Sequence, residues 1–203
     1  MISDRVIKMK SSLRIKAKKK RLLITLNIKS KNAFLKHINS CLDNIFSLDC
    51  SIKEIGLYYP ILNEVSPLAF VKYFKTSNIT TALPVVDVNT KSMVFKKWSE
   101  KEKLQKGHFG NYEPSLGNKT IFPQIIIVPM LMFDRKLNRL GYGSGYYDKS
   151  IFSLKQFFHR KEKKFFTIGL AYSEQETKRL PYESHDQKLD FIVTEKEILS
   201  KVD

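Results

Sequence analysis

The sequence predicts an α/β fold with a mainly parallel central sheet. Strand-like and helix-like segments alternate along the chain, which is typical of βαβ units. One strand-like segment, residues 124–128 (QIIIV), is apolar almost throughout, as expected of a strand covered on both faces. The 203 residues contain no internal repeat and no low-complexity linker, so we expect a single domain over residues 1–203.

Two helices are expected first, over residues 3–26 and 30–47. Both segments lack Gly and Pro and carry apolar residues at helical spacing. The expected buried stripes are Ile7, Leu13, Ala17, Leu22 and Leu26 in the first helix and Phe34, Ile38, Leu42, Ile45 and Phe46 in the second.

The later elements alternate. Ser66 and Pro67 favour a helix start, because Ser caps a helix and Pro fits its first turn. Thr194 and Glu197 match a capping box, which predicts a short final helix. Residues 99–123 are rich in Gly and Pro and are expected to be irregular. The expected strands are 53–59, 79–86, 91–98, 124–128, 165–171 and 189–193, with helices at 66–76 and 146–160.

The chain carries a formal net charge of +16, and residues 1–31, with eleven basic residues and one acid, contribute +10 of it. Such a segment favours a partner rich in phosphate or carboxylate, but it is equally compatible with lysines on a solvated helix face. The longest apolar stretch, residues 125–133, is too short to span a bilayer. Cys41 and Cys50 are too few for a disulfide framework or a cysteine zinc site, so we expect a cytoplasmic protein.

The segment most informative about chemistry is residues 139–148 (RLGYGSGYYD), which follows a buried strand and precedes a helix. Gly141, Gly143 and Gly145 allow successive N–H groups to point into one concavity and hold a phosphate, and the helix N-terminus adds partial positive charge. The spacing matches neither a P-loop nor a dinucleotide fingerprint. A merely tight strand–helix turn remains an alternative interpretation of the glycines alone.

Charged residues converge on this segment. Arg139 is suited to grip phosphate oxygens, and Asp148 is suited to hold Mg²⁺. Asp190, at the start of the last predicted strand, is a second candidate ligand, and Asp134 and Asp186 are candidates with weaker placement.

The N-terminal helix and the histidines complete the set of candidates. Lys10 and Arg14 are four residues apart, so they share a helix face and can hold the same anion. The four histidines form no HExxH pattern, and the chain has no GxSxG motif, which argues against a zinc hydrolase and a serine hydrolase.

The segment from Val128 to Asp148 closely resembles the signature of the 5-formyltetrahydrofolate cyclo-ligase family (5,10-methenyltetrahydrofolate synthetases). The resemblance continues in order along essentially the whole chain. Its further motifs are Lys10 with Ser12-Leu13-Arg14, Tyr58-Tyr59-Pro60 with Asn63-Glu64-Val65, Phe109-Gly110, Glu113-Pro114, Leu180-Pro181, His185-Asp186, Leu189-Asp190 and Val193-Thr194-Glu195. Within the signature, Ser144 stands where many members have Gly, Lys149 replaces a frequent Arg, and Leu137 replaces the usual Gly.

The resemblance implies a three-layer α/β/α domain and a site for ATP, Mg²⁺ and a reduced folate. The implied ATP-binding residues are Lys10, Arg14, Arg139, Leu140, Gly141, Tyr142, Gly143, Ser144, Gly145, Tyr146 and Tyr147, of which Lys10, Arg139 and Tyr147 are the catalytic candidates. The implied metal ligands are Asp148 and Asp190, and the implied folate contacts are Tyr59, Glu64 and Phe109.

The activity that the resemblance implies is ATP-dependent conversion of 5-formyltetrahydrofolate to 5,10-methenyltetrahydrofolate, with release of ADP and phosphate. The implied partner is this small molecule, with or without a polyglutamate tail, and a monomer that binds neither nucleic acid nor membrane is expected. Two alternatives stay open on the residues alone: a basic RNA-binding protein, and another phosphate-handling α/β enzyme such as a sugar-phosphate isomerase.

Overall fold

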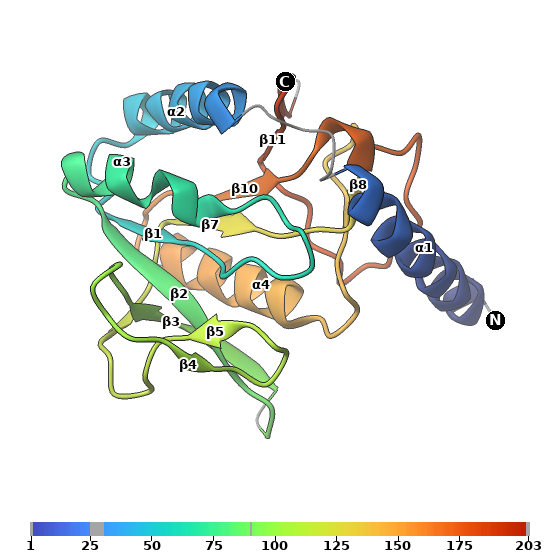
Figure 1. The fold of residues 1–203 in the computed structure, drawn as a ribbon, viewed down its shortest axis with the longest axis horizontal. Helices are drawn as coiled ribbons and strands as arrows, with labels where there is room; N and C mark the ends of the chain where they lie inside the picture. Colours follow the sequence, from blue (N-terminus) through green and yellow to red (C-terminus); the bar gives the residue numbers. More distant parts are fainter. Residues whose placement is uncertain (1, 25–30, 90, 202–203) are drawn as a thin grey trace.

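A computed structural model describes residues 2–24, 31–89 and 91–201 of the chain (Figure 1). Four α-helices, two short 3₁₀ helices and twelve strands follow one another within these residues. In chain order they are α1 (Ile2–Ile24), α2 (Lys31–Leu48), β1 (Glu54–Gly56), η1 (Pro67–Phe70), α3 (Val71–Thr76), β2 (Thr80–Asp87), β3 (Ser92–Lys97), β4 (Gln105–Lys106), β5 (Tyr112–Glu113), β6 (Thr120–Ile121), β7 (Ile125–Val128), β8 (Met132–Phe133), β9 (Arg139–Leu140), α4 (Tyr146–His159), β10 (Phe166–Leu170), η2 (Ser173–Gln175), β11 (Phe191–Val193) and β12 (Ile198–Ser200).

Eight of the strands form one sheet in the order β12-β11-β10-β7-β1-β2-β3-β6. The five strands from β11 to β2 are parallel, and antiparallel strands extend the sheet at both edges. The chain moves outward from β1 to β2, then returns to β7 on the other side of β1 and continues to β10 and β11. The strand order therefore reverses between β1 and β7, which is where open α/β sheets bind ligands.

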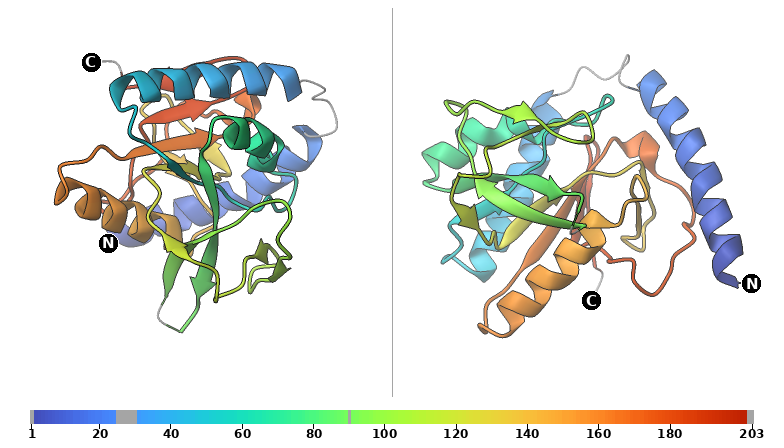
Figure 2. Two further views of the ribbon diagram at one scale, coloured as in Figure 1. Left: turned by 90° about the vertical axis from the view of Figure 1, so that its left-hand side faces the viewer. Right: turned by 90° about the horizontal axis from the view of Figure 1, so that it is seen from below.

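Helices cover both faces of the sheet, which confirms the predicted α/β class (Figure 2). On one face, α2 and α3 pack through Ile38, Leu42 and Phe74 against β1 and β7. On the other face, α4 packs through Ile151 and Leu154. The central strand β7 is buried at all four positions and feeds both clusters, as the continuous apolar run predicted.

The helix α1 lies beside this layered body, along one end of it (Figure 2). Its predicted apolar stripe is wrong at Ile7 and Leu22, which are both 51% exposed, and Leu26 lies outside the described residues. The buried face consists instead of Lys10, Ala17, Arg21 and Ile24. The physical reason is that α1 packs on polar loops rather than on the apolar core, so its inward face carries charge.

Two local predictions were also wrong. The predicted final helix after Thr194 is absent from the described residues, because residues 194–197 form a tight turn between β11 and β12. Thr194 Oγ1 accepts the Glu197 N–H at 3.0 Å, as a helix cap would, but the chain then reverses into a strand. Residues 99–123, predicted to be irregular, contain the short strands β4, β5 and β6.

Leu137, which stands where the resemblance predicts Gly, has φ = 63° in the turn between β8 and β9. This left-handed conformation costs an L-residue about 1–2 kcal/mol. The Leu137 side chain is 3% exposed within the cluster under α4, so its burial offsets the strain. The turn is further fixed by the buried Asp134 carboxylate, which accepts the N–H groups of Lys136, Asn138 and Leu180. Asp134 is therefore explained by the turn.

No helix among the described residues is long and apolar enough to cross a membrane. Both cysteines are free thiols, with Cys41 buried in α2 and Cys50 exposed.

Candidate active site

A cavity of about 590 Å³ opens at the end of the sheet where the strand order reverses. Segments that follow the carboxyl ends of β1 and β7 contribute Tyr58 and Pro129 to its wall, and the end of β2 contributes Val86. The cavity is large enough for a drug-sized organic ligand. Its wall is completed by α1, by the glycine-rich loop before α4 and by the segment before β11.

All but one of the site residues that the family resemblance implies line this cavity. They are Lys10, Arg14, Tyr59, Glu64, Phe109, Arg139, Leu140, Gly141, Tyr142, Gly143, Ser144, Gly145, Tyr146, Tyr147 and Asp148. The exception is Asp190, at the opposite, amino-terminal end of β11, which is not among the lining residues. Its Oδ2 accepts the N–H and the hydroxyl of Thr167 at 2.9 and 2.8 Å. The hydrogen bonds of Asp190 therefore run to Thr167 on β10 and not to a residue of the cavity wall.

The glycine-rich loop is shaped by backbone conformations that favour glycine. Gly143 has φ = 108°, and Gly145, directly before α4, has φ = 74°. Arg14 lies against this loop: its Nε donates to the Gly141 carbonyl at 2.9 Å, and a Cβ at Gly143 would lie 3.1 Å from its guanidinium carbon. A side chain at position 143 would therefore displace Arg14.

Arg139 and Asp148 form an ion pair across the loop, with Arg139 Nη2 donating to Asp148 Oδ1 at 2.8 Å. Both are also bonded to Gln187: Arg139 Nη1 donates to its carbonyl at 2.5 Å, and its N–H donates to Asp148 Oδ1 at 2.9 Å. The segment before β11 is thereby fastened to the loop, and Asp148 Oδ1 is occupied by two donors.

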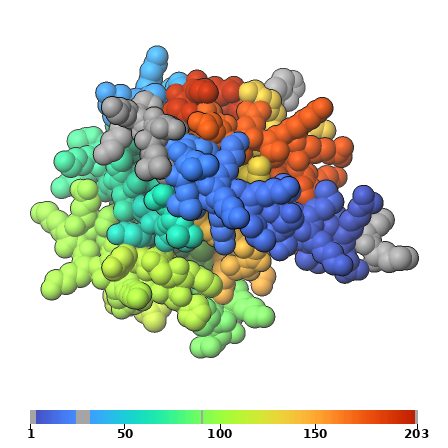
Figure 3. All heavy atoms as spheres, turned by 45° about the vertical axis from the view of Figure 1, so that its right-hand side comes forward, coloured from blue at the N-terminus to red at the C-terminus, as the bar shows by residue number. Residues whose placement is uncertain are grey.

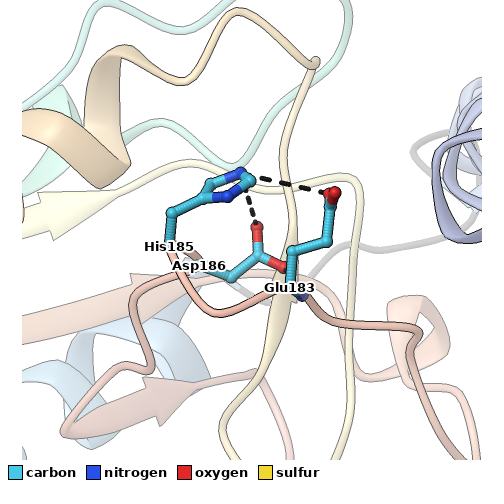
Figure 4. Close-up of side chains that lie close together, drawn as sticks. All are labelled: Glu183, His185 and Asp186. Carbon is cyan, nitrogen blue, oxygen red and sulfur yellow. Dashed lines mark hydrogen bonds and ion pairs between the residues drawn. The ribbon is translucent and has the colours of Figure 1, made fainter. Parts of the chain in front are cut away.

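Lys10 extends from α1 to the same C-terminal segment. Its Nζ donates to Glu183 Oε2 at 2.8 Å and to Asp186 Oδ2 at 2.5 Å, and its side chain is 7% exposed. His185 lies between these carboxylates, with its Nε2 4.0 Å from Glu183 Oε2 and 3.9 Å from Asp186 Oδ1 (Figure 4). The ligand atoms of Glu183, His185 and Asp186 lie within 4.8 Å of one another, which is close enough to share a cation.

Glu64 is a buried carboxylate, 3% exposed, in the wall of the cavity. Its Oε1 accepts the Tyr142 hydroxyl at 2.8 Å, and its Oε2 accepts the Ile61 N–H at 2.9 Å. Burial raises the pKa of Glu64, while the Ile61 N–H, Arg21 and Tyr142 act to lower it. The same burial raises the pKa of the Tyr142 and Tyr147 hydroxyls above their ordinary value, so both stay protonated near neutral pH.

Aromatic side chains border one side of the cavity. Tyr59 packs against Tyr112 with ring centroids 5.1 Å apart, and Phe109 packs edge-on against Tyr146 at 5.6 Å. Phe109 lies in the turn between β4 and β5, and 46% of it is exposed. A flat aromatic ligand would find apolar faces on this side and cations on the α1 side.

A family model for 5-formyltetrahydrofolate cyclo-ligases matches residues 6–195 of the chain. The chain belongs to this family. The resemblance that the motifs carried is thereby confirmed.

Individual cyclo-ligases are similar to the chain at moderate sequence identity. One from Haemophilus influenzae is 32% identical over 142 residues, which is 68% of this chain and 73% of that protein. One from Mus musculus is 29% identical over 153 residues, 70% of this chain and 73% of that protein.

Solved structures of cyclo-ligases, described as 5,10-methenyltetrahydrofolate synthetases, share the fold. The Aquifex aeolicus protein superposes with a TM-score of 0.66 at 30% identity, covering 95% of this chain and 92% of that one. The Mycoplasma pneumoniae protein gives a TM-score of 0.64 at 25% identity, covering 92% and 98% of the two chains.

Two parts of the cyclo-ligase site carry no local signal in the sequence strong enough to predict them. Glu183 and Asp186 both precede β11, and they reach the cavity because the segment before that strand turns back toward Lys10 on α1. No local pattern in the sequence indicates that path. Arg21 is one of eleven basic residues in the N-terminal segment, yet it is 1% exposed. Its position seven residues after Arg14, which is two helical turns, was the available signal that it lies on the site side of α1.

Proposed function

We propose that this cyclo-ligase converts 5-formyltetrahydrofolate to 5,10-methenyltetrahydrofolate at the expense of ATP, which becomes ADP and phosphate. The observation that carries the proposal is that a single cavity has the glycine-rich loop in one wall and the predicted folate contacts in another. One site of this kind holds both substrates next to each other, as direct phosphoryl transfer between them requires.

The cations favour binding of the triphosphate along α1 and the loop. Lys10, Arg14 and Arg139 all line the cavity, and Gly143 and Gly145 leave the loop backbone accessible at the amino end of α4. Helix N-termini and successive backbone N–H groups bind phosphate well. The folate would then lie between Tyr59, Phe109 and Glu64, with its ring system on the aromatic side of the cavity.

The chemistry needs no covalent enzyme intermediate. The formyl oxygen on N5 attacks the γ-phosphorus, ADP leaves, and the formyl carbon becomes an iminium carrying a phosphate ester. N10 then attacks that carbon and loses its proton, and phosphate leaves to close the methenyl ring. The protein's part is to hold the formyl oxygen in line with the γ-phosphorus and to neutralise charge on the transferring group, which Lys10, Arg14 and Arg139 are positioned to do. The Tyr147 hydroxyl stays protonated and is available as a donor.

The carboxylates of the cavity fit Mg²⁺ in their chemistry, because carboxylate oxygens are the ligands that this ion prefers. Asp148 and Asp186 both line the cavity, whereas Asp190 bonds to Thr167 elsewhere. We therefore propose Asp148 and Asp186 as metal ligands, with Asp186 in the role first expected of Asp190. When bound, Mg²⁺ supplies positive charge to the transferring phosphoryl group.

The decisive experiment mixes the purified protein with 5-formyltetrahydrofolate, ATP and Mg²⁺ and records the absorbance of the methenyl product. We expect the signal with all three components and its loss when either ATP or Mg²⁺ is omitted. No signal from a protein with intact circular dichroism contradicts the proposed activity. A sugar-phosphate isomerase would give no signal in this assay, so the two enzyme alternatives are separated directly.

Substitutions then test the metal assignment. Asp148→Asn and Asp186→Asn are each expected to raise the Mg²⁺ concentration for half-maximal rate by at least tenfold. Asp190→Asn is the matched control, with the same chemical change at a carboxylate outside the cavity, and should leave this concentration within twofold. A shift in Asp190→Asn equal to that in Asp148→Asn would restore the original pair.

We further propose that the chain works as a single-domain monomer in the reducing cytoplasm. The two buried apolar clusters lie on opposite faces of one sheet, which supports one domain, and the two free thiols support a reducing compartment.

A further inference from the structure

Arg21 is the least expected charged group of the structure. It lies on α1 and is only 1% exposed, and it is the largest fully buried side chain among the described residues. The neighbouring Lys18, Lys19 and Lys20 of the same helix are all exposed. Burying a guanidinium is costly unless its donors are used, and replacing a buried ion pair by apolar groups is often neutral or stabilising. Its burial therefore needs an explanation other than stability.

The contacts of Arg21 join three segments of the site. Its Nη2 donates to the Tyr142 hydroxyl at 2.5 Å, and its Nη1 donates to the Met130 carbonyl, after β7, at 3.3 Å. The Tyr142 hydroxyl donates in turn to Glu64 Oε1, and Arg21 Nη1 lies 3.6 Å from the same oxygen. Figure 3 shows α1 in blue bordering the teal segment around residue 60, which carries Glu64.

Arg21 itself is not among the residues that line the cavity, whereas Tyr142 and Glu64 are. Its hydrogen bond to Tyr142 and its ion pair with Glu64 therefore connect it to the cavity wall. We propose that Arg21 is a positioning residue, which through the Tyr142 hydroxyl holds the Glu64 carboxylate ionised and correctly oriented on the folate side of the cavity. This inference rests on the proposed function, because it assigns Glu64 the role of accepting hydrogen bonds from the folate.

The charges around Glu64 make the consequence specific. Among the described residues, Arg21 from α1 and Tyr142 from the glycine-rich loop contact Glu64, and Tyr58 after β1 and Tyr147 on α4 interact with its charge. Arg21 is the one cation in this set, and the three phenols are neutral near pH 7. Burial already raises the pKa of Glu64, so removing Arg21 raises it further and lets the carboxylate take up a proton at a higher pH.

The test measures the dissociation constant of 5-formyltetrahydrofolate, without ATP, from pH 6 to pH 8. Arg21→Met, which keeps an unbranched side chain and removes the charge, is expected to weaken binding roughly tenfold at pH 8. The ratio of mutant to wild-type constants should then grow by roughly another tenfold as the pH falls to 6, because protonated Glu64 no longer accepts. Lys20→Met, the matched loss of an exposed charge one residue away, should stay within twofold at every pH.

Two further variants test the route through Tyr142. Tyr142→Phe removes only the hydroxyl and should also weaken folate binding roughly tenfold. In the double variant of Arg21→Met and Tyr142→Phe, the loss of folate affinity should equal the larger of the two single losses, because both substitutions interrupt the same chain of hydrogen bonds. Arg21→Lys keeps the charge but not the fork, so it should lose less affinity and show a mutant-to-wild-type ratio that does not change with pH.

Each outcome decides something. Wild-type protein that does not bind 5-formyltetrahydrofolate overturns the proposed function and this inference with it. Wild-type binding with Arg21→Met equal to Lys20→Met overturns the inference alone. A loss that is the same at all pH values, or one that adds fully in the double variant, reduces Arg21 to a structural residue. If Arg21→Met does not fold, the Tyr142→Phe affinity and the pH profile of Arg21→Lys carry the same decision.

Discussion

The two N-terminal helices bury opposite kinds of surface. The inward face of α2 is apolar, with Phe34, Ile38, Leu42 and Ile45 between 0% and 4% exposed against the sheet. The inward face of α1 contains Lys10 and Arg21 at 6% and 1% exposure, while Leu22 and Leu23 face outward at 51% and 67%. One helix therefore belongs to the core, and the other forms a wall of the site.

The difference shows what hydrophobic periodicity measures. The rule assumes that the surface opposite a helix is apolar, which holds for α2 above β1 and β7. The surface opposite α1 includes the glycine-rich loop, the segment before β11 and the Met130 carbonyl after β7, whose carbonyls and carboxylates favour cations. Substitutions on the inward face of α1 should therefore affect catalysis more than folding, and those on α2 folding more than catalysis.

The largest expected effect is that of Lys10→Met on α1. Loss of an ammonium that would neutralise the transferring phosphoryl group should lower kcat by about 10³-fold. The unfolding free energy should change by about 1 kcal/mol or less, because Glu183 and Asp186 retain 19% and 24% exposure and can be rehydrated. Steady-state kinetics and urea unfolding measure the two quantities. A variant that loses stability in proportion to activity would make α1 an ordinary structural helix.

The reverse outcome is expected for Leu42→Ala on α2. The Leu42 side chain is 0% exposed, so its truncation should lower the unfolding free energy by about 3 kcal/mol. The kcat of the remaining folded enzyme, measured well below the unfolding transition, should stay within twofold. Leu48→Ala, at a 53% exposed position of the same helix, is the control and should cost under about 0.5 kcal/mol. Equal costs at the two positions would contradict the assigned core face.

The fold was predictable from the sequence where local pattern and tertiary environment agree. The apolar run before Pro129 identified the central strand, and the stripe from Phe34 to Ile45 identified the core face of α2. The turn at Thr194 was not predictable, because the same hydroxyl bond to the Glu197 N–H begins either a helix or a hairpin. A hairpin forms here because β12 pairs with β11, and this pairing depends on residues beyond the capping motif.

The site was predictable where a motif carries its own geometry, as residues 139–148 do. It was not predictable where the geometry is long-range. Asp186 and Asp190 both precede β11, yet only Asp186 lines the cavity, because it bonds to Lys10 on α1 whereas Asp190 bonds to Thr167 on β10. Arg21 likewise becomes a site residue only through partners more than 40 residues away, at Glu64 and Tyr142.

A smaller effect is expected from pH, because the apolar inward face of α2 buries the Cys41 thiol and disfavours its ionised form. Burial raises the pKa of the Cys41 thiol on α2 from 9.0 to about 12, so the folded protein retains this proton while the unfolded chain loses it above pH 9. The stability that this proton contributes is fully present below pH 9 and is lost as the pH rises toward 12. The loss in unfolding free energy should be about 2 kcal/mol at pH 10.5. Tyrosines contribute in the same direction, so urea unfolding of wild type and Cys41→Ala is compared between pH 8 and 10.5. Parallel curves would contradict a buried Cys41.

The smallest effect is expected on the outward face of α1, and it tests what the basic N-terminus is for. Lys16 and Lys19 are both exposed and are neither in the cavity wall nor in contact with Tyr142, unlike Lys18, whose Nζ lies 5.5 Å from that ring centroid. Lys16→Met and Lys19→Met should each change stability by under about 0.5 kcal/mol and the KM for ATP by less than twofold. An RNA-binding surface would behave differently, because each lost phosphate contact lowers the affinity for single-stranded RNA. It also reduces the slope of log affinity against log salt concentration by about one. If the affinity for RNA falls in both variants and its salt dependence becomes shallower, the outward face of α1 binds a partner of its own. If the kinetics are unchanged and no RNA binds, Lys10, Arg14 and Arg21 are the cations of this helix that the enzyme uses.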